Sequence, residues 1–233
     1  MNISDRTLDI LSNFASINQS ILIREGNDLT TIAASKNLLA ETTMEENFGR
    51  DVGIYDLTKF LGVLRLYKER DFDFSEEYVT IFNEKNRKQY TKFYYSDASV
   101  IVTPPTGKSI AFPDEDIITT FSLTSKDLQT IIKGCSIMTL PEVSIVGASG
   151  EPIRVSGVDI NNSAMGSFNH ELEQNADDTF EFVIALENLI KLMHGDYQIA
   201  FLNSGISRFI NTSVDIKYYV AVNANKDLSL IHI

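Results

Sequence analysis

The chain has 233 residues, of which 43% are hydrophobic, so it can bury a substantial core, and its length suits one large domain or two smaller ones. Its single cysteine, Cys135, cannot form an internal disulfide, and no segment approaches the roughly 20 apolar residues of a membrane-spanning helix. The formal net charge of −12 argues against a general nucleic-acid binder, because most DNA-binding proteins carry a basic excess that neutralises phosphates. The N-terminus lacks the basic start and apolar core of a signal peptide, so we predict a protein of a reducing cytoplasm that does not associate with membranes.

The first half of the chain predicts two short helices among extended segments. The first helix covers 4–16, begins at the capping residue Ser4 and carries one apolar stripe that includes Leu8 and Leu11. The second covers 56–68 and again has a single apolar stripe. Strand-like runs separated by turn residues are predicted at 21–23, 29–33, 38–44, 78–83, 88–95 and 100–103.

A proline-rich and acidic stretch separates the two halves. Pro104, Pro105 and Pro113 lie within 99–119, and an acidic cluster at 114–116 follows the last of them. Clustered prolines interrupt regular structure and are typical of linkers. We therefore predict an N-terminal domain at 1–103, an interdomain linker at 104–119 and a C-terminal domain at 120–227.

The second half predicts the same kinds of element again. One helix covers 125–136 after the polar pair Thr124-Ser125, and another covers 186–194. Strands are predicted at 143–146, 153–158, 180–185, 197–202, 208–212 and 216–222. The chain is thus expected to belong to the α+β class.

The two halves repeat one pattern residue against residue. At an offset of 120, the residues Ile3, Ser4, Arg6, Leu8 and Leu11 fall on Leu123, Thr124, Lys126, Leu128 and Ile131. At an offset of 129, the residues Ile54, Leu57, Phe60, Leu61 and Leu64 fall on Val183, Leu186, Leu189, Ile190 and Met193. Two domains of one design, each with two short helices among many strands, explain both offsets. The alternative is a chance match of apolar periodicity.

The acidic residues lie almost wholly outside the four predicted helices. These helices hold seven basic and five acidic side chains, a net charge of +2, and the rest of the chain holds 13 basic and 27 acidic side chains, a net charge of −14. A protein that touches DNA only with its helices could have this distribution. The candidate DNA-facing residues are Arg6, Lys59, Arg65, Lys126, Lys133 and Lys191. For each one alone, the alternative is an ordinary solvated side chain.

Five segments carry a family resemblance that covers nearly the whole chain. They are 11–18, 52–64, 112–113, 127–129 and 219–221, and the most specific of them is 52–64. In order and spacing they resemble the sliding clamps of T-even-type bacteriophages, which are DNA polymerase processivity factors. The resemblance implies the DNA-clamp fold, in which two similar domains each pack two short helices on antiparallel sheets and the subunits assemble into a ring.

The resemblance also implies a mode of action and a set of partners. A head-to-tail homotrimer would encircle double-stranded DNA, with the helices lining the hole. Its other expected partners are the phage DNA polymerase, an ATP-driven clamp loader complex and late transcription factors, in the cytoplasm of the host cell. The family has no active site, so we expect no enzyme activity, no cofactor and no metal.

Two kinds of site follow from this resemblance. Helix cations would make exchangeable phosphate contacts, because a ring holds DNA by topology and tight binding would stop it sliding. In clamps generally, a partner peptide inserts apolar side chains between the linker and the C-terminal domain's sheet. The matching positions here are Phe112, Pro113, Tyr219 and Val220. The alternative for these four is an ordinary place in the core.

The last six residues, 228–233, depart from the family. They read as a translation of CTGTCTCTTATACACATC, the end sequence of a transposon adapter used in sequencing libraries. We expect this segment to be a non-native tail, the true C-terminus to be missing, and His232 to have no function.

Other chemistry is weakly indicated. Gly107-Lys108-Ser109 resembles the end of a phosphate-binding loop, but Val102 stands where the first glycine belongs. The acidic groups at 71–73, 114–116 and 177–178 are expected to be solvated turns rather than metal sites. His170 and His194 have no Cys or His partner at ligand spacing, and Cys135 is expected to be a small buried residue.

The main alternative function is that of a β-rich oligomeric phage structural protein that never surrounds DNA. Such a protein would have no reason to place cations on repeated helices opposite the core. A hydrolase is less favoured still, because no nucleophile–base pair or metal cluster is evident.

Overall fold

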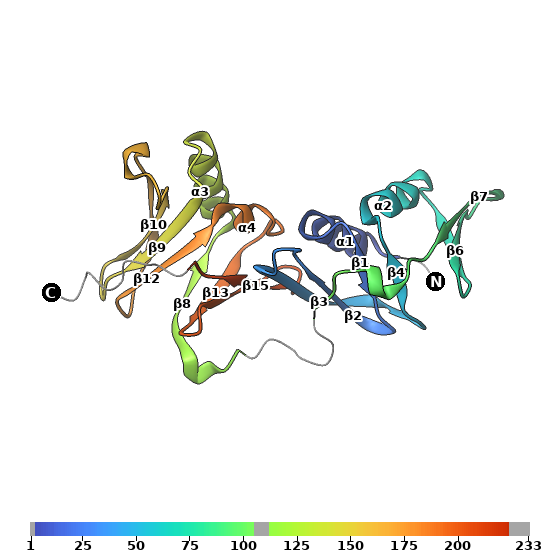
Figure 1. Cartoon of the computed structure of the whole chain (residues 1–233), viewed down its shortest axis with the longest axis horizontal. Helices are drawn as coiled ribbons and strands as arrows, with labels where there is room; N and C mark the ends of the chain where they lie inside the picture. Colours follow the sequence, from blue (N-terminus) through green and yellow to red (C-terminus); the bar gives the residue numbers. More distant parts are fainter. Residues whose placement is uncertain (1–2, 105–111, 224–233) are drawn as a thin grey trace. The chain divides into compact units, whose positions relative to one another are not determined.

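A computed structural model of the chain describes residues 3–104 and 112–223. The chain divides into two compact units, residues 1–107 and 108–233 (Figure 1). The segment Gly107-Lys108-Ser109 and the predicted tail at 228–233, with His232, lie outside the described residues. Within the described residues, no helix is long and apolar enough to cross a membrane.

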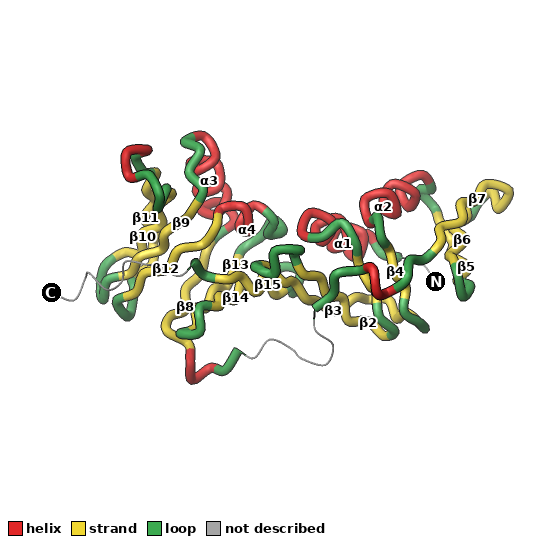
Figure 2. Tube along the Cα trace, viewed as in Figure 1, coloured by secondary structure: helices red, strands yellow, loops and turns green. Residues whose placement is uncertain are grey.

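Two amphipathic helices form one side of the N-terminal unit. Helix α1 (Asp5–Ile17) begins where the Ser4 hydroxyl accepts a hydrogen bond from the Thr7 N–H, and it buries an apolar stripe that includes Leu11 and Phe14. Helix α2 (Leu57–Leu66) is capped in the same way by the Asp56 carboxylate. The two helices contact each other side by side (Figure 2). Local capping therefore sets both helix starts that the sequence predicts.

Antiparallel strands form the rest of this unit. Strand β1 (Ile21–Ile23) pairs with β4 (Val52–Ile54), and β2 (Gly26–Ile32) pairs with β3 (Leu38–Phe48). Strands β5 (Arg70–Phe74), β6 (Tyr78–Asn83) and β7 (Asn86–Tyr94) form a separate sheet in that order, with β7 at one edge. Most of the side chains of β7 are exposed.

Two sequence predictions in this unit are wrong. Residues 100–103, all of them described, form no strand, and Ala98–Val100 form a 3-10 helix (η1). The Asp97 carboxylate accepts a hydrogen bond from the Ser99 N–H (2.8 Å), which favours a turn over an extended strand. The segment 71–73 is not a solvated turn but part of strand β5, where the Asp71 carboxylate pairs with Arg87 at 2.6 Å.

The C-terminal unit contains two antiparallel sheets. Strands β9 (Glu142–Gly147), β10 (Pro152–Val158), β11 (Phe168–Asn175) and β12 (Phe180–Ala185) form one, in the order β11-β10-β9-β12. Strands β8 (Ile117–Leu123), β13 (Tyr197–Leu202), β14 (Ile206–Asn211) and β15 (Lys217–Ala221) follow one another in the other. Short 3-10 helices lie at Asp114–Asp116 (η2) and Ser163–Met165 (η3). Residues 117–119, which the predicted linker includes, belong to β8.

Stacked phenylalanine rings join the two sheets. Phe121 of β8 lies 6.4 Å from Phe180 of β12, and Phe182 of β12 lies 4.2 Å from Phe201 of β13, with the rings nearly parallel in both pairs. Aromatic side chains bury a large apolar area, so this cluster is a main element of the core. It fixes which face of the β8-β13-β14-β15 sheet is buried and which is left for a surface.

Helix α3 (Ser125–Ile137) packs closely on β10 and β11. A Cβ atom at Gly157 of β10 would lie 2.5 Å from the Cys135 Sγ, so only glycine permits this approach. Burial raises the pKa of the Cys135 thiol, as expected for a small buried residue.

The last helix is shorter than the sequence predicts. Helix α4 covers Leu186–Ile190 rather than 186–194, and Lys191 is its C-cap. Its end is held by tertiary contacts, because the Met193 N–H donates to the Tyr218 hydroxyl (3.2 Å) and the Met193 carbonyl accepts from the Tyr197 hydroxyl. These bonds require 191–194 to leave the helical path, which apolar periodicity alone cannot show.

Candidate functional site

Four of the six predicted DNA-facing cations are exposed on helices. Lys59 and Arg65 lie on α2, and Lys126 and Lys133 lie on α3. Lys126 and Lys133 are seven residues apart, so they lie on the same face of the helix two turns apart. This face is opposite the buried stripe that contains Leu128. Each helix therefore exposes cations to solvent on one face, while its opposite face is buried in the core.

The other two predicted cations are half-buried. The Arg6 Nη1 donates a hydrogen bond to the Thr43 carbonyl (3.2 Å), and α1 also exposes the carboxylates of Asp5 and Asp9. Lys191 follows α4 instead of lying within it, and its backbone N–H bonds to the Asn188 carbonyl (3.2 Å). These two cations are therefore less exposed than the other four, and the structure supports them less well as DNA-facing residues.

Hydrogen bonds hold the helices in position. The Arg65 Nη2 on α2 donates to the Ser12 hydroxyl on α1 (2.9 Å), so it links the two helices of the N-terminal unit. At the start of α3, the Asp127 carboxylate accepts from the Thr124 hydroxyl (2.6 Å) and lies 2.8 Å from the His170 Nε2. His170 therefore has a structural partner on α3.

A buried carboxylate lies at the start of α1. Glu46 of β3 is 8% exposed and accepts hydrogen bonds from the Thr7 hydroxyl (2.6 Å) and from the Ser4 N–H. Burial acts to raise the pKa of Glu46, but the hydrogen bonds from Thr7 and Ser4 together outweigh it, so the net pKa is lowered. A negative charge at this end also complements the helix dipole.

The part of the chain that the structure describes holds no metal-like cluster, that is, no group of three or more His, Cys, Asp or Glu side chains placed to bind an ion. His194 lies near the Ser125 hydroxyl (3.1 Å), which is not a metal-ligand arrangement. The acidic residues at 114–116 form η2, and 177–178 form a bend after β11.

Three of the predicted peptide-pocket residues lie near one face of the β8-β13-β14-β15 sheet. The Phe112 ring lies 6.1 Å from the Tyr219 ring, and the Arg208 guanidinium carbon lies 4.1 Å above the centre of the Phe112 ring. Pro113 follows directly, is half-buried and precedes η2. The structure thus brings Phe112 and Tyr219 together and adds Arg208 to them.

Val220 lies on the other face of the sheet. Successive strand residues point to opposite faces, so Val220 points away from the side on which Tyr219 meets Phe112. It is fully buried, and its carbonyl accepts from the Ser207 hydroxyl (2.9 Å). Val220 therefore belongs to the core beneath this surface and does not line it.

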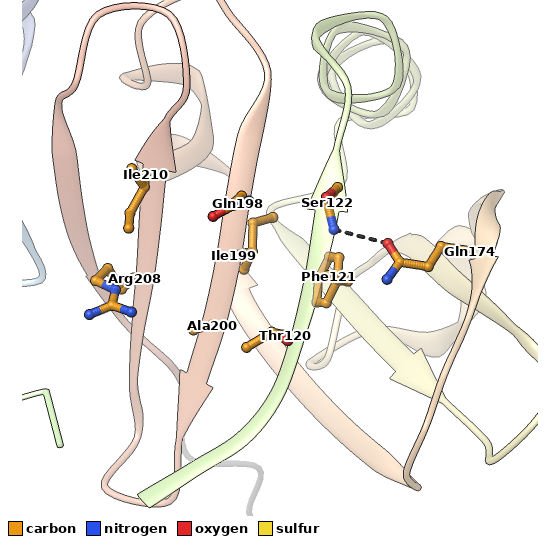
Figure 3. A pocket seen from close by; sticks show the side chains of 9 residues that line it. All are labelled: Thr120, Phe121, Ser122, Gln174, Gln198, Ile199, Ala200, Arg208 and Ile210. Atoms are coloured by element: carbon orange, nitrogen blue, oxygen red, sulfur yellow. Dashed lines mark hydrogen bonds between the residues drawn. The ribbon is translucent and has the colours of Figure 1, made fainter. Parts of the chain in front are cut away.

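A groove of about 270 Å³ crosses strands β14, β13 and β8 of this sheet (Figure 3), and Arg208, which lines its β14 end, also lies over the Phe112 ring. Arg208 pairs across the strands with Tyr219 on one side and Ala200 on the other, and Ala200 pairs with Thr120. We call this the Arg208 groove, and the residues that line it include Thr120, Ser122, Gln174, Gln198, Arg208 and Ile210. Sequence reasoning misses Arg208, because only strand register shows that it neighbours Tyr219.

Solved structures with this architecture are DNA clamps. A PCNA of A. fulgidus bound to the C-terminal region of FEN-1 matches with a TM-score of 0.66 at 10% identity, over 92% of this chain and 94% of that chain. A Helicobacter pylori beta clamp bound to a DNA ligase peptide also gives a TM-score of 0.66, at 16% identity over 92% of this chain, which spans 62% of that longer chain. The chain has the DNA-clamp fold.

Sequence comparison identifies the family within this fold. Residues 4–103 match the family described as DNA polymerase processivity factor, and residues 120–224 match the C-terminal gp45 sliding clamp family. The sliding clamp of Vibrio phage KVP40 is 28% identical over 96% of this chain and 100% of its own length, and that of Escherichia phage RB69 is 29% identical over 97% and 98%. The chain belongs to the family of T-even-type phage sliding clamps, which are polymerase processivity factors and not enzymes. These matches do not support the alternative of a structural protein.

Proposed function

We propose that this sliding clamp encircles duplex DNA as a head-to-tail homotrimer, with the cations of α2 and α3 directed at the DNA backbone. The observation that carries this proposal is the exposure of Lys59, Lys126 and Lys133 on packed helices in a chain of net charge −12. A few exchangeable phosphate contacts are enough when the ring itself prevents dissociation. Elsewhere the acidic surface repels DNA, which disfavours binding outside the ring.

The test is polymerase processivity on primed circular DNA with the variant Lys59→Ala, Lys126→Ala, Lys133→Ala. We expect normal folding, since exposed substitutions usually change stability by about 0.5 kcal/mol or less each. Processivity should fall, and the dependence of DNA residence on salt should weaken by roughly one unit of slope per lost phosphate contact.

The matched control removes three positive charges from strands and loops. It carries Arg24→Ala, Arg154→Ala and Lys36→Asn, the last because Lys36 has a positive φ of 59° that asparagine tolerates. Equal losses in the helix variant and the control would mean that net charge, and not the helix surface, matters. Unchanged processivity in the helix variant would contradict the proposal.

Edge strands support assembly between copies. Strand β7 is an edge of its sheet and carries Arg87, Lys88 and Lys92 without an acidic residue, whereas the edge strand β11 carries Glu171 and Glu173. Unpaired edges of opposite charge suit a head-to-tail contact, which gives a ring when the rotation between successive copies closes, as proposed here for three copies. Analytical ultracentrifugation should therefore show a trimer, and a strict monomer at tens of micromolar protein would contradict the proposal.

The partner surface is proposed to be the contact between Phe112, Pro113 and Tyr219 on the C-terminal unit. One of the two fold relatives is bound to a DNA ligase peptide and the other to the C-terminal region of FEN-1, which supports a proposal that this chain also docks peptides. We extend it here to the phage DNA polymerase and the clamp loader complex in the host cytoplasm, and to late transcription factors. The half-buried Phe112 beside Tyr219 would anchor an apolar side chain of such a partner.

A further inference from the structure

The Arg208 groove has a single charged residue, and that residue is a cation. Its lining residues include no aspartate or glutamate, although the whole chain has 32 acidic and 20 basic side chains. In so acidic a protein, a groove that contains only positive charge is an unusual local environment. A cation with no nearby opposite charge attracts an anionic group from outside.

Arg208 is held in place without being neutralised. Its guanidinium lies over the Phe112 ring, with the carbon 4.1 Å from the ring centre, which fixes the plane of the group. Among the described residues it has no ion pair or hydrogen-bond partner, and its Nε is buried and unsatisfied. Buried donors normally have partners, so this unsatisfied Nε is unusual. The side chain as a whole is only half-buried, so a ligand in the groove would meet the other N–H groups of the guanidinium and not Nε.

The other polar groups of the groove suit a polypeptide. The Gln174 Oε1 accepts a hydrogen bond from the Ser122 N–H (3.0 Å), which fixes that side chain across β8 and β11 (Figure 3). The Gln198 amide is exposed on β13 between Ser122 and Ile210. Amide and hydroxyl groups can bond to the N–H and carbonyl groups of an extended peptide backbone.

The dimensions and position of the groove also fit a peptide. Strands β14, β13 and β8 are neighbours, and at about 4.8 Å per spacing the groove crosses about 10 Å, or roughly three extended residues. Its Arg208 end directly adjoins the Phe112–Tyr219 contact. One bound segment could therefore place an apolar side chain at that contact and an acidic one at Arg208.

We infer that Arg208 is a specificity residue that binds a carboxylate of the docked partner, so that the clamp selects acidic peptides. This inference rests on the proposed peptide docking at Phe112 and Tyr219. Arg208 presents a planar fork of donors that matches a carboxylate in two-point contact. The apolar contact gives the peptide its anchor, and Arg208 distinguishes an aspartate or glutamate from its amide.

The experiment measures binding of the polymerase C-terminal peptide by fluorescence anisotropy, at low and high salt. The form of this peptide that carries Asp and Glu is called the acidic peptide. A second form, the amide peptide, has each Asp and Glu replaced by Asn and Gln. The clamp variants are Arg208→Gln, the conservative Arg208→Lys, Gln198→Glu and Tyr219→Ala. Gln198→Glu leaves the Phe112 contact intact and offers Arg208 an internal carboxylate, and Tyr219→Ala tests the docking itself. Arg154→Gln is the control, because it removes one arginine charge from an exposed position on β10.

Arg208→Gln should weaken binding of the acidic peptide about tenfold, as expected for loss of a charged hydrogen bond. Gln198→Glu should also weaken it, Arg208→Lys should retain part of the affinity, and Arg154→Gln should change little. The amide peptide should bind the wild type about as weakly as the acidic peptide binds Arg208→Gln. The amide peptide should bind Arg208→Gln with the same affinity as it binds the wild type.

The outcomes separate the two proposals. If Arg208→Gln and Gln198→Glu bind the acidic peptide as the wild type does while Tyr219→Ala weakens it, the carboxylate site is refuted and peptide docking stands. If Tyr219→Ala is also without effect, docking at this surface fails as well. If Arg208→Gln instead changes the sedimentation of the clamp and not its peptide affinity, a second copy occupies the groove, which also refutes the inference.

Discussion

The buried carboxylate of Glu46 should stabilise the N-terminal unit strongly at neutral pH. Glu46→Gln keeps the size of the side chain but removes the charge that accepts hydrogen bonds from Thr7 and Ser4 at the start of α1. Hydrogen bonds to a charged group contribute about 1.5–3 kcal/mol. For a unit of this size we therefore expect the melting temperature to fall by roughly 6–24 °C, at about 4–8 °C per kcal/mol.

The pH dependence of the effect follows from the pKa of Glu46. Because this pKa is lower in the folded chain than the ordinary value of 4.5, the charge stabilises the fold fully above the unfolded pKa. That contribution is lost as the pH falls through the lowered folded pKa. The stability difference between wild type and Glu46→Gln should thus be largest at pH 7 and shrink as the pH falls below 4.5.

Thermal unfolding followed by circular dichroism at several pH values measures this difference. Glu45→Gln is the matched control, since Glu45 is the neighbouring residue on β3 and is exposed. An equal effect of the two substitutions at pH 7, or a Glu46→Gln effect that does not change with pH, would refute the assigned role.

Three further predictions concern the C-terminal unit. Tyr219→Ala should fold and bind the polymerase C-terminal peptide more weakly in the anisotropy assay, and unchanged affinity would remove Tyr219 from the partner surface. Gly157→Ala should lower the melting temperature, because its Cβ would clash with Cys135 at 2.5 Å, and overpacking costs roughly 1–3 kcal/mol. Gly150→Asn, at a turn with open space and a φ of +82°, should cost less. The Cys135 thiol should react slowly with a thiol reagent in the native clamp and quickly in urea, since it is fully buried; fast native labelling would contradict the packing of α3 on β10.

Some features of the fold follow from local sequence alone. Ser4 and Thr124 predict the starts of α1 and α3 because a capping hydroxyl satisfies backbone N–H groups wherever the helix lies. The strands β12 and β13 begin and end where the apolar runs 180–185 and 197–202 predict them. The bounds of these elements can be predicted because they depend on residues that are close together in the sequence.

Other features depend on what each segment packs against. Strand β11 is polar and mostly exposed, so its sequence gives no strand pattern, and it is extended because β10 pairs with it. Helix α4 ends early because Tyr197 and Tyr218, distant in sequence, bond to Met193. Likewise, a period of two shows that Tyr219 and Val220 point in opposite directions. Only the phenylalanine core decides which of the two faces the other sheet, and only cross-strand register places Arg208 beside Tyr219.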